Sequence, residues 1–141
     1  MKLGILITPG SHSQALAKKA EALGFDSAFF VDSPALFGDP FVSMAAAAVQ
    51  TERIALAVGV TNPLTRSAPV AASSVAALNV LAPGRIILGI GVGDSATQAM
   101  GQRRATLAEL ETFVAQVRSL LNGEETEVSL ATGETIVRFL N

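Results

Sequence analysis

Short apolar runs alternate four times with segments of helical pattern along residues 1–123. Each run is continuously apolar instead of alternating between apolar and polar positions, which is typical of a strand buried on both faces of a parallel sheet. Strands separated by helices indicate βα units around one sheet, and so an α/β fold. The predicted strands are Leu3–Ile7, Ser27–Val31, Ile54–Val60 and Ile86–Ile90.

Residue types at the ends of the helical segments predict where each helix begins and ends. Ser11 and Gln14 have the spacing of a capping box, which predicts a first helix that runs to Leu23 and stops at Gly24. Asp39-Pro40 predicts the start of a second helix, since Asp is a good N-cap and Pro fits the first turn. The second helix is expected to reach about Gln50, the third to run from near Ser67-Ala68-Pro69 to just before Pro83-Gly84, and the fourth from near Arg104 to Asn122-Gly123.

The last residues, 124–141, differ in pattern from the four βα units. Glu127–Leu130 and Thr135–Leu140 are predicted as two short strands of a hairpin around residues 131–134. With no linker of changed composition before them, we expect residues 1–141 to form a single domain.

Small residues crowd the second and third helices, with four alanines at 45–48 and further alanines at 71, 72, 76 and 77. A helix apolar on most sides is buried on most sides. Two interpretations stay open: close packing on the sheet, or an interface between subunits.

Glycines alternate along the end of the fourth strand, at Gly89, Gly91 and Gly93, and the polar pair Asp94-Ser95 follows. Glycine at every second position leaves one face of a strand without side chains, which indicates that something approaches the backbone closely. A bound ring system or a tightly packed neighbour would both satisfy this pattern.

Polar residues follow all four strands, at Thr8-Pro9-Gly10, Asp32-Ser33, Gly59–Asn62 and Gly91–Ser95. Parallel strands place these positions on one rim, where ligands of α/β folds bind. The rim lacks an evident pair of nucleophile and base, which favours a chemistry that a cofactor carries.

Composition narrows the class of protein. Half of the residues are hydrophobic, 16% are charged, and the net charge is −2 without a basic stripe, so nucleic acid is an improbable partner. No apolar stretch is long enough to predict a membrane helix. Without cysteine, disulfides and thiolate metal sites are excluded, and we expect a cytoplasmic protein with a small-molecule substrate.

Several single residues allow competing interpretations. Asp32, Asp39 and Asp94 come from different loops without a histidine, so no metal site is predicted; Asp39 is explained as a helix cap and Asp94 as a turn residue. His12 is expected to be exposed, and Glu52-Arg53 to be structural. Arg66 fits an anion contact or a surface ion pair. Gly91-Val-Gly93-Asp-Ser-Ala96 loosely fits a dinucleotide fingerprint, a weak alternative because no acidic residue ends a strand further on.

The order of short motifs resembles the bacterial luciferase-like superfamily of flavin- and F420-dependent oxidoreductases, most closely its methylene-tetrahydromethanopterin reductase-like branch. The motifs are Ala22–Asp26, Asp39–Phe41, Thr51–Ile54, Gly59–Pro63 and Pro83–Ser95. This resemblance implies a (βα)8 TIM barrel with FMN or F420 over the strand ends. It also implies a non-proline cis peptide near Gly59-Val60, and pairing of subunits through helices two and three.

The resemblance assigns cofactor-binding positions and no catalytic residue. The positions are Asp32, Gly59, Val60, Thr61, Asn62, Gly93 and Asp94. Many members carry histidine after the acid of strand two, where this chain has Ser33, so the resemblance does not extend to acid–base chemistry at that position.

A complete barrel takes about 250 residues, so 141 residues with four βα units predict only its N-terminal half. Such a half-barrel leaves strands one and four unpaired and the inner sheet face exposed, which favours a homo-oligomer through those edges or through helices two and three. Two functions follow. One is a truncated luciferase-like oxidoreductase or monooxygenase, and the other is a cofactor-free scaffold that self-associates.

Overall fold

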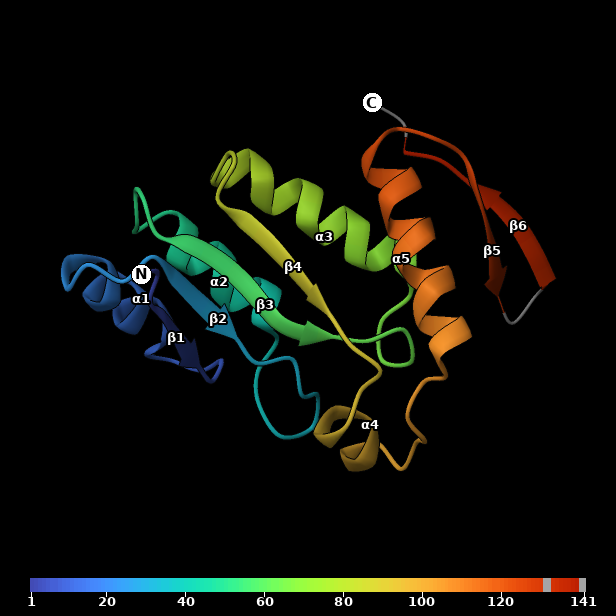
Figure 1. Ribbon diagram of the computed structural model, residues 1–141, viewed down its shortest axis with the longest axis horizontal. Helices are drawn as coiled ribbons and strands as arrows, with labels where there is room; N and C mark the ends of the chain where they lie inside the picture. The colour runs from blue at the N-terminus through green and yellow to red at the C-terminus, as the bar shows by residue number, and fades with distance from the viewer. Residues whose placement is uncertain (131–132, 140–141) are drawn as a thin grey trace.

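A computed structural model describes residues 1–130 and 133–139. Its main sheet has four parallel strands in the order β1 (Gly4–Ile7), β2 (Ser27–Phe30), β3 (Ala55–Thr61) and β4 (Ile86–Ile90) (Figure 1). A crossover helix follows each of the first three strands, as parallel neighbours require. The predicted α/β architecture of four βα units, half of a (βα)8 barrel, is confirmed.

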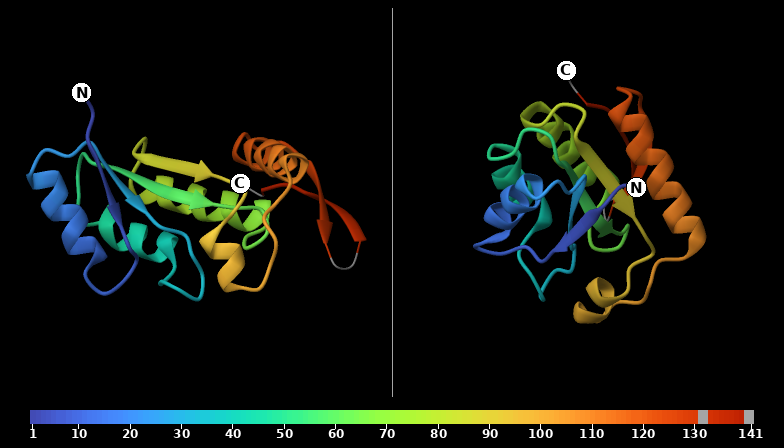
Figure 2. Two further views of the ribbon diagram at one scale, coloured as in Figure 1. Left: turned by 60° about the horizontal axis from the view of Figure 1, so that its bottom comes forward. Right: turned by 60° about the vertical axis from the view of Figure 1, so that its left-hand side comes forward.

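Three helices cover one face of this sheet, α1 (Ser13–Ala22), α2 (Pro40–Ala48) and α3 (Ala68–Leu81) (Figure 2). After β4 come the short α4 (Ser95–Ala99) and the long α5 (Leu107–Leu121), which packs along α3. An antiparallel hairpin of β5 (Thr126–Leu130) and β6 (Gly133–Val137) follows α5, which confirms the predicted hairpin. β5 begins one residue earlier than predicted, and β6 includes residues 133 and 134 of the predicted turn at 131–134. Residues 131–132 of that turn and the predicted strand end at Leu140 lie outside the described residues.

The core lies between the sheet and the three helices. Ile7, Phe30, Val58 and Leu88 form one row across all four strands on the helix side, and the first three are almost fully buried. Ala47, Ala48, Ala71 and Ala72 are buried in the core, so at these positions the small residues serve close packing.

The opposite face of the sheet is open. Leu6, Phe29, Ala57 and Ile87 form the next row in register and point away from the helices. Leu6 is 65% exposed and Ile87 is 44% exposed, because no helix or strand within residues 1–130 and 133–139 covers these side chains. The prediction that β1 is buried on both faces is therefore wrong, whereas the predicted exposed inner face and unpaired outer edges of β1 and β4 are confirmed.

Two local predictions at helix ends are wrong. The first helix begins after His12, and Ser11 does not cap it; instead the Gln14 side chain donates to the Ser11 carbonyl. The helix expected from Arg104 begins at Leu107, where Thr106 and Glu109 form a complete capping box. Asp94, expected as a turn residue, lies directly before the short helix α4.

Two polar anchors fix the end of the sheet opposite the rim. The Glu21 carboxylate accepts the backbone N–H groups of residues 52, 53 and 54, which confirms a structural role for the segment before β3. Arg85, directly before β4, donates to the carbonyls of Ala48 and Thr51 at the end of α2. Among the described residues, no helix is long and apolar enough to cross a membrane.

Candidate functional site

A cavity of about 360 Å³ lies at the carboxyl ends of β2, β3 and β4. Three segments line it: residues 31–33, residues 59, 60 and 62, and residues 91–96. Six of the seven predicted cofactor-binding residues are therefore brought together, namely Asp32, Gly59, Val60, Asn62, Gly93 and Asp94. The seventh, Thr61, is fully buried and does not line the cavity.

A larger hollow of about 480 Å³ lies between α3, α5 and β5. Its walls contain none of the predicted site residues. Its polar side chains Glu109, Gln116 and Ser129 already form hydrogen bonds within the chain. We therefore place the candidate site at the strand ends, where polar groups converge from three strands.

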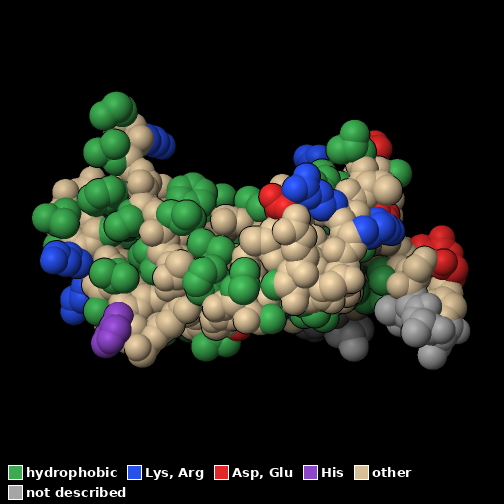
Figure 3. All heavy atoms as spheres, turned by 90° about the horizontal axis from the view of Figure 1, so that it is seen from below, with side chains coloured by type: hydrophobic (Ala, Val, Ile, Leu, Met, Phe, Trp, Pro, Cys, Tyr) green, Lys and Arg blue, Asp and Glu red, His purple; other side chains and the backbone are tan. Residues whose placement is uncertain are grey.

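The end of β3 shapes one wall of the cavity. The Gly59-Val60 peptide bond is cis, as predicted, and the pairing of β3 with β4 shifts between Val58 and Thr61. The Val60 side chain is 47% exposed at the cavity. Figure 3, which views the molecule from below relative to Figure 1, shows hydrophobic side chains over much of that side of the molecule.

Close packing against the segment around Val60 explains two of the three alternating glycines, Gly89 and Gly91, whereas Gly93 has a positive φ and lies against Thr97 and Asn62. A Cβ atom on Gly89 would contact the Val58 carbonyl oxygen and come within 2.9 Å of a Val60 methyl carbon, and one on Gly91 would come within 3.0 Å of the other methyl. Of the two alternatives for this pattern, the tightly packed neighbour is present. This glycine strip, residues 89–93, is followed by the five-residue helix α4, whereas a dinucleotide fingerprint opens a long helix.

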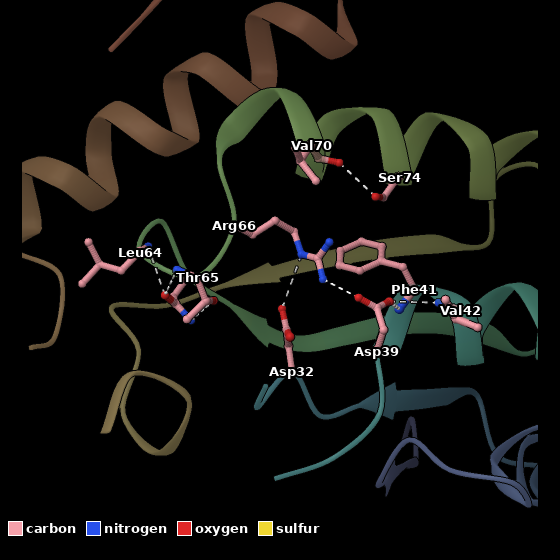
Figure 4. A network of polar contacts seen from close by, with 10 residues as sticks. Asp32, Asp39, Phe41, Val42, Leu64, Thr65, Arg66, Val70 and Ser74 are labelled. Carbon is pink, nitrogen blue, oxygen red and sulfur yellow. Dashed lines mark hydrogen bonds and ion pairs between the residues drawn. The ribbon is translucent and has the colours of Figure 1, made fainter. Parts of the chain in front are cut away.

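The side chain of Asn62 forms hydrogen bonds within the loop that follows β3. Its Oδ1 accepts the backbone N–H groups of Leu64 and Thr65, and its Nδ2 donates to the Thr65 hydroxyl (Figure 4). The residue is 1% exposed. It therefore holds the shape of the loop after β3, and its contribution to the cavity is mainly steric.

Asp32 is the buried acidic group of the cavity wall and is 3% exposed. Its Oδ2 is buried without a hydrogen-bond partner, and so are the Thr61 Oγ1 and the Arg66 Nε. Burial raises the pKa of the Asp32 carboxyl above its usual value, and Asp39 acts in the same direction, while the Thr61 hydroxyl and the Arg66 charge oppose the shift.

Arg66 lies between two carboxylates, and of these it favours Asp39. Its Nη2 is 2.6 Å from Asp39 Oδ2, whereas its Nε is 3.9 Å from Asp32 Oδ2 (Figure 4). Its guanidinium also stacks over the Phe41 ring, with 4.4 Å between its central carbon and the ring centroid. The Arg66 side chain is 16% exposed and the Asp39 side chain is 41% exposed, so the expected surface ion pair is present, with its arginine partly covered.

Asp39 caps α2, as predicted, through Oδ1, which accepts the N–H groups of Phe41 and Val42. Burial acts to raise its pKa, but the hydrogen bond from Arg66 and those two N–H groups outweigh burial and lower it. Asp39 is therefore the carboxylate that holds Arg66 in place.

The far wall of the cavity comes from residues 94–96. Asp94 is exposed and accepts hydrogen bonds from Gln98 and Arg104. The hydroxyls of Ser33 and Ser95 lie 3.0 Å apart and join the end of β2 to α4. Our sequence analysis did not assign these serines, although both follow an aspartate at a strand end, a repeat that could have indicated their pairing.

The site offers two kinds of surface, an apolar wall of Val60 and glycine backbone and a polar wall around Asp32. This combination suits a flat ring with polar edges. Among the described residues, no group of three or more His, Asp or Glu side chains stands together as a metal site would require.

Comparisons with known proteins agree with this arrangement. The family model described as luciferase-like monooxygenase matches residues 7–138. The 5,10-methylenetetrahydromethanopterin reductase of Methanolobus tindarius is 40% identical over 111 residues, which cover 77% of this chain and 34% of that protein. The chain thus spans about a third of the length of that relative.

Two solved structures are also similar. The coenzyme F420 dependent tetrahydromethanopterin reductase from Methanopyrus kandleri aligns with a TM-score of 0.70 and 28% identity, over 85% of this chain and 39% of that one. A type II Baeyer–Villiger monooxygenase from the CAM plasmid of Pseudomonas putida, in complex with FMN, aligns with a TM-score of 0.78 over 96% of this chain and 43% of that one. Its identity of 21% supports likeness of fold alone.

Proposed function

This chain belongs to the luciferase-like monooxygenase family, and on that premise we propose that it forms the ring-binding N-terminal part of an FMN- or F420-dependent oxidoreductase. The observation that carries the proposal is the cavity at the strand ends, which joins the exposed Val60 side chain and the glycine strip to the buried Asp32 carboxyl. Similarity to a coenzyme F420 dependent reductase favours F420 as the cofactor. Similarity of fold to a monooxygenase solved with FMN makes FMN the alternative cofactor.

The residues of the cavity fit a planar ring. Val60 offers an apolar side chain that packs against Gly91, Gly93 contributes backbone to the wall, and Asp32 offers a polar partner to the ring edge. When bound, the ring would supply hydride transfer, or oxygen activation in the case of a flavin, and the protein would orient it and exclude water. The chain's own residues do not need to act as nucleophiles in this proposal.

The phosphate-bearing tail of the cofactor needs a different set of residues. The arginines around the strand ends are already paired, Arg66 with Asp39, Arg103 with Glu109 and Arg104 with Asp94. We therefore propose that this part of the protein binds the ring weakly by itself, and that further barrel units hold the tail.

The alternative function, a cofactor-free scaffold that self-associates, is favoured by the open sheet face with the exposed Leu6 and Ile87. A second surface suits a second copy of the chain, a groove of about 240 Å³ between α2 and α3 whose lining includes Val42, Ala45, Ala77 and Leu81. Small residues there allow close approach of helices from two copies. We propose a homo-oligomer formed through one of these two surfaces.

The test is a titration of the purified chain with FMN and with F420, in samples whose mass is measured by light scattering. If the proposal is correct, binding is saturable, and Val60→Asp weakens it at least tenfold. Val80→Asp is the matched control, because Val80 is an equally apolar, 80% exposed residue near the end of α3. Absence of binding together with a dimer mass would support the scaffold instead.

Two further substitutions identify the surface that joins the copies. Leu6→Lys places a charge on the open sheet face, and Val42→Lys places one in the α2–α3 groove. The variant that becomes monomeric marks the interface. A wild-type chain that is a folded monomer at micromolar concentration contradicts both surfaces.

A further inference from the structure

Two carboxylates and one guanidinium form a cluster beside the cavity, in which the Asp32 side chain is 2% exposed, that of Arg66 16% and that of Asp39 41%. Arg66 donates to Asp39 at 2.6 Å, which leaves Asp32 at 3.9 Å, too far for a hydrogen bond (Figure 4). With both acids ionised the cluster carries a net charge of −1, and with one of them protonated it is neutral. A buried site favours the neutral state, because an uncompensated charge loses its hydration.

Asp39 keeps its negative charge because its carboxylate is satisfied on both sides. One oxygen caps α2 through two backbone N–H groups, and the other accepts from Arg66. Asp32 has no such support at Oδ2, which is buried without a partner. Between the two acids, Asp32 is therefore the one on which a proton resides.

We propose that Asp32 is the proton-holding residue of the rim cavity, kept neutral because Asp39 engages the Arg66 guanidinium, and that it donates a hydrogen bond to an acceptor on the bound ring. Arg66 and Asp39 act through Asp32 and are positioning residues. The second half of this inference, the contact with the ring, rests on the proposed function, whereas the protonation of Asp32 does not.

The surroundings of Asp32 agree with this assignment. Burial raises the pKa of the Asp32 carboxyl above its usual value of 3.8, and the hydroxyl of Thr61 on β3 and the charge of Arg66 oppose the shift. The charged groups that face Asp32 are Arg66 from the loop after β3 and Asp39 from the start of α2. Across the cavity, Asp94 is exposed and is paired with Arg104, so solvent screens its effect on Asp32.

The experiment measures the protonation of Asp32 directly, by carbon-13 NMR of the aspartate carboxyl carbons of the cofactor-free chain between pH 3 and pH 8. Asp32 is assigned from the signal that Asp32→Asn removes. We expect its midpoint above 3.8 in the wild type. In Asp39→Asn the freed guanidinium turns to Asp32, and the midpoint falls.

Asp39→Asn is a clean variant because asparagine is as good an N-cap as aspartate, so α2 keeps its two capping hydrogen bonds. Arg66→Met removes the only nearby positive charge and raises the midpoint further; if that variant does not fold, Arg66→Lys, which cannot reach both acids at once, replaces it. Asp26→Asn is the matched control, since Asp26 lies at the other end of β2 and accepts from the Leu3 N–H. It leaves the Asp32 midpoint unchanged.

A wild-type midpoint at or below 3.8, or an unchanged midpoint in Asp39→Asn, overturns the inference. The contact with the ring is tested by cofactor titration of Asp32→Asn and Asp32→Ala at a pH below the measured wild-type midpoint, where Asp32 carries its proton. Asparagine keeps a hydrogen-bond donor at this position, so the affinity for the cofactor stays within about threefold of wild type. Alanine has no donor, and the affinity falls tenfold or more. If the NMR result holds and neither FMN nor F420 binds the wild type, the proposed function fails while the protonation of Asp32 stands.

Discussion

Replacing Arg85 tests how the end of α2 is joined to the sheet. Its guanidinium makes four hydrogen bonds, from Nη1 to the Thr51 hydroxyl and the Ile54 carbonyl, and from Nη2 to the Ala48 and Thr51 carbonyls. Three acceptors are main-chain carbonyls at or after the end of α2, where helix carbonyls lack partners. The positive charge also complements the negative end of the helix dipole.

The size of the effect follows from these bonds. A hydrogen bond to a charged group contributes about 1.5–3 kcal/mol, but the four bonds share one side chain and are not additive. Arg85 is partly exposed, so water replaces some of them in a variant. We expect Arg85→Met to lower the free energy of unfolding by about 2–4 kcal/mol. Arg85→Lys keeps the positive charge but loses the planar guanidinium with its paired donors, and it lowers the free energy of unfolding by about 1–2 kcal/mol.

The assay is urea-induced unfolding followed by circular dichroism at 222 nm, since the chain has neither Trp nor Tyr for fluorescence. Measurements at two protein concentrations separate unfolding from dissociation. Arg118→Met, an exposed arginine on α5, is the control and changes stability by less than about 0.5 kcal/mol. If Arg85→Met and Arg118→Met lower the free energy of unfolding equally, the hydrogen bonds of Arg85 make no net contribution to stability.

Three further predictions concern other parts of the fold. Gly89→Ala forces a Cβ against a backbone oxygen and lowers stability by about 1–3 kcal/mol or more, whereas Gly10→Ala, with open space around it, does not; thermal unfolding compares them. Glu109 has a pKa lowered from 4.5 to about 2, first by its hydrogen bond from Arg103, so its stabilising contribution is complete above pH 4.5 and disappears as pH falls toward 2. The difference between wild type and Glu109→Gln in a pH series of urea midpoints shrinks over that range. Glu21→Ala leaves the N–H groups of residues 52–54 without their acceptor, so it lowers the free energy of unfolding by about 1–2 kcal/mol and speeds hydrogen exchange at these residues. Unchanged exchange there would contradict the role of Glu21 as an anchor.

Local features of the sequence were enough to predict the order of elements. The four apolar runs match β1 to β4 within one or two residues, and Asp39-Pro40 starts α2 where expected. Such features act between residues a few positions apart, so the chain records them directly. The capping box of α5 belongs to the same class, because Thr106 and Glu109 have the required spacing. It was missed in favour of an earlier start at Arg104.

The position of the site also followed from the sequence, since parallel strands carry their last residues to one rim. The cavity joins Asp32, Val60 and Asp94 from three strand ends, as the order of the strands required. What each residue does there was not predictable in the same way. Asn62 was expected to contact the cofactor, but its side chain forms hydrogen bonds with residues of its own loop. Thr61 is fully buried beneath the wall of the cavity.

The tertiary structure alone decided the partners of the charged groups and the burial of the strands. Arg66 lies 27 positions from Asp39 and 34 from Asp32 in the chain, so only the packing of α2 against the loop after β3 determines which acid it holds. Leu6 has the same apolar character as Ile7, yet Leu6 is exposed and Ile7 is buried, because helices cover one face of the sheet and no described helix or strand covers the other. Hydrophobic pattern encodes a tendency to be buried, whereas actual burial depends on the elements that the completed fold places on each face.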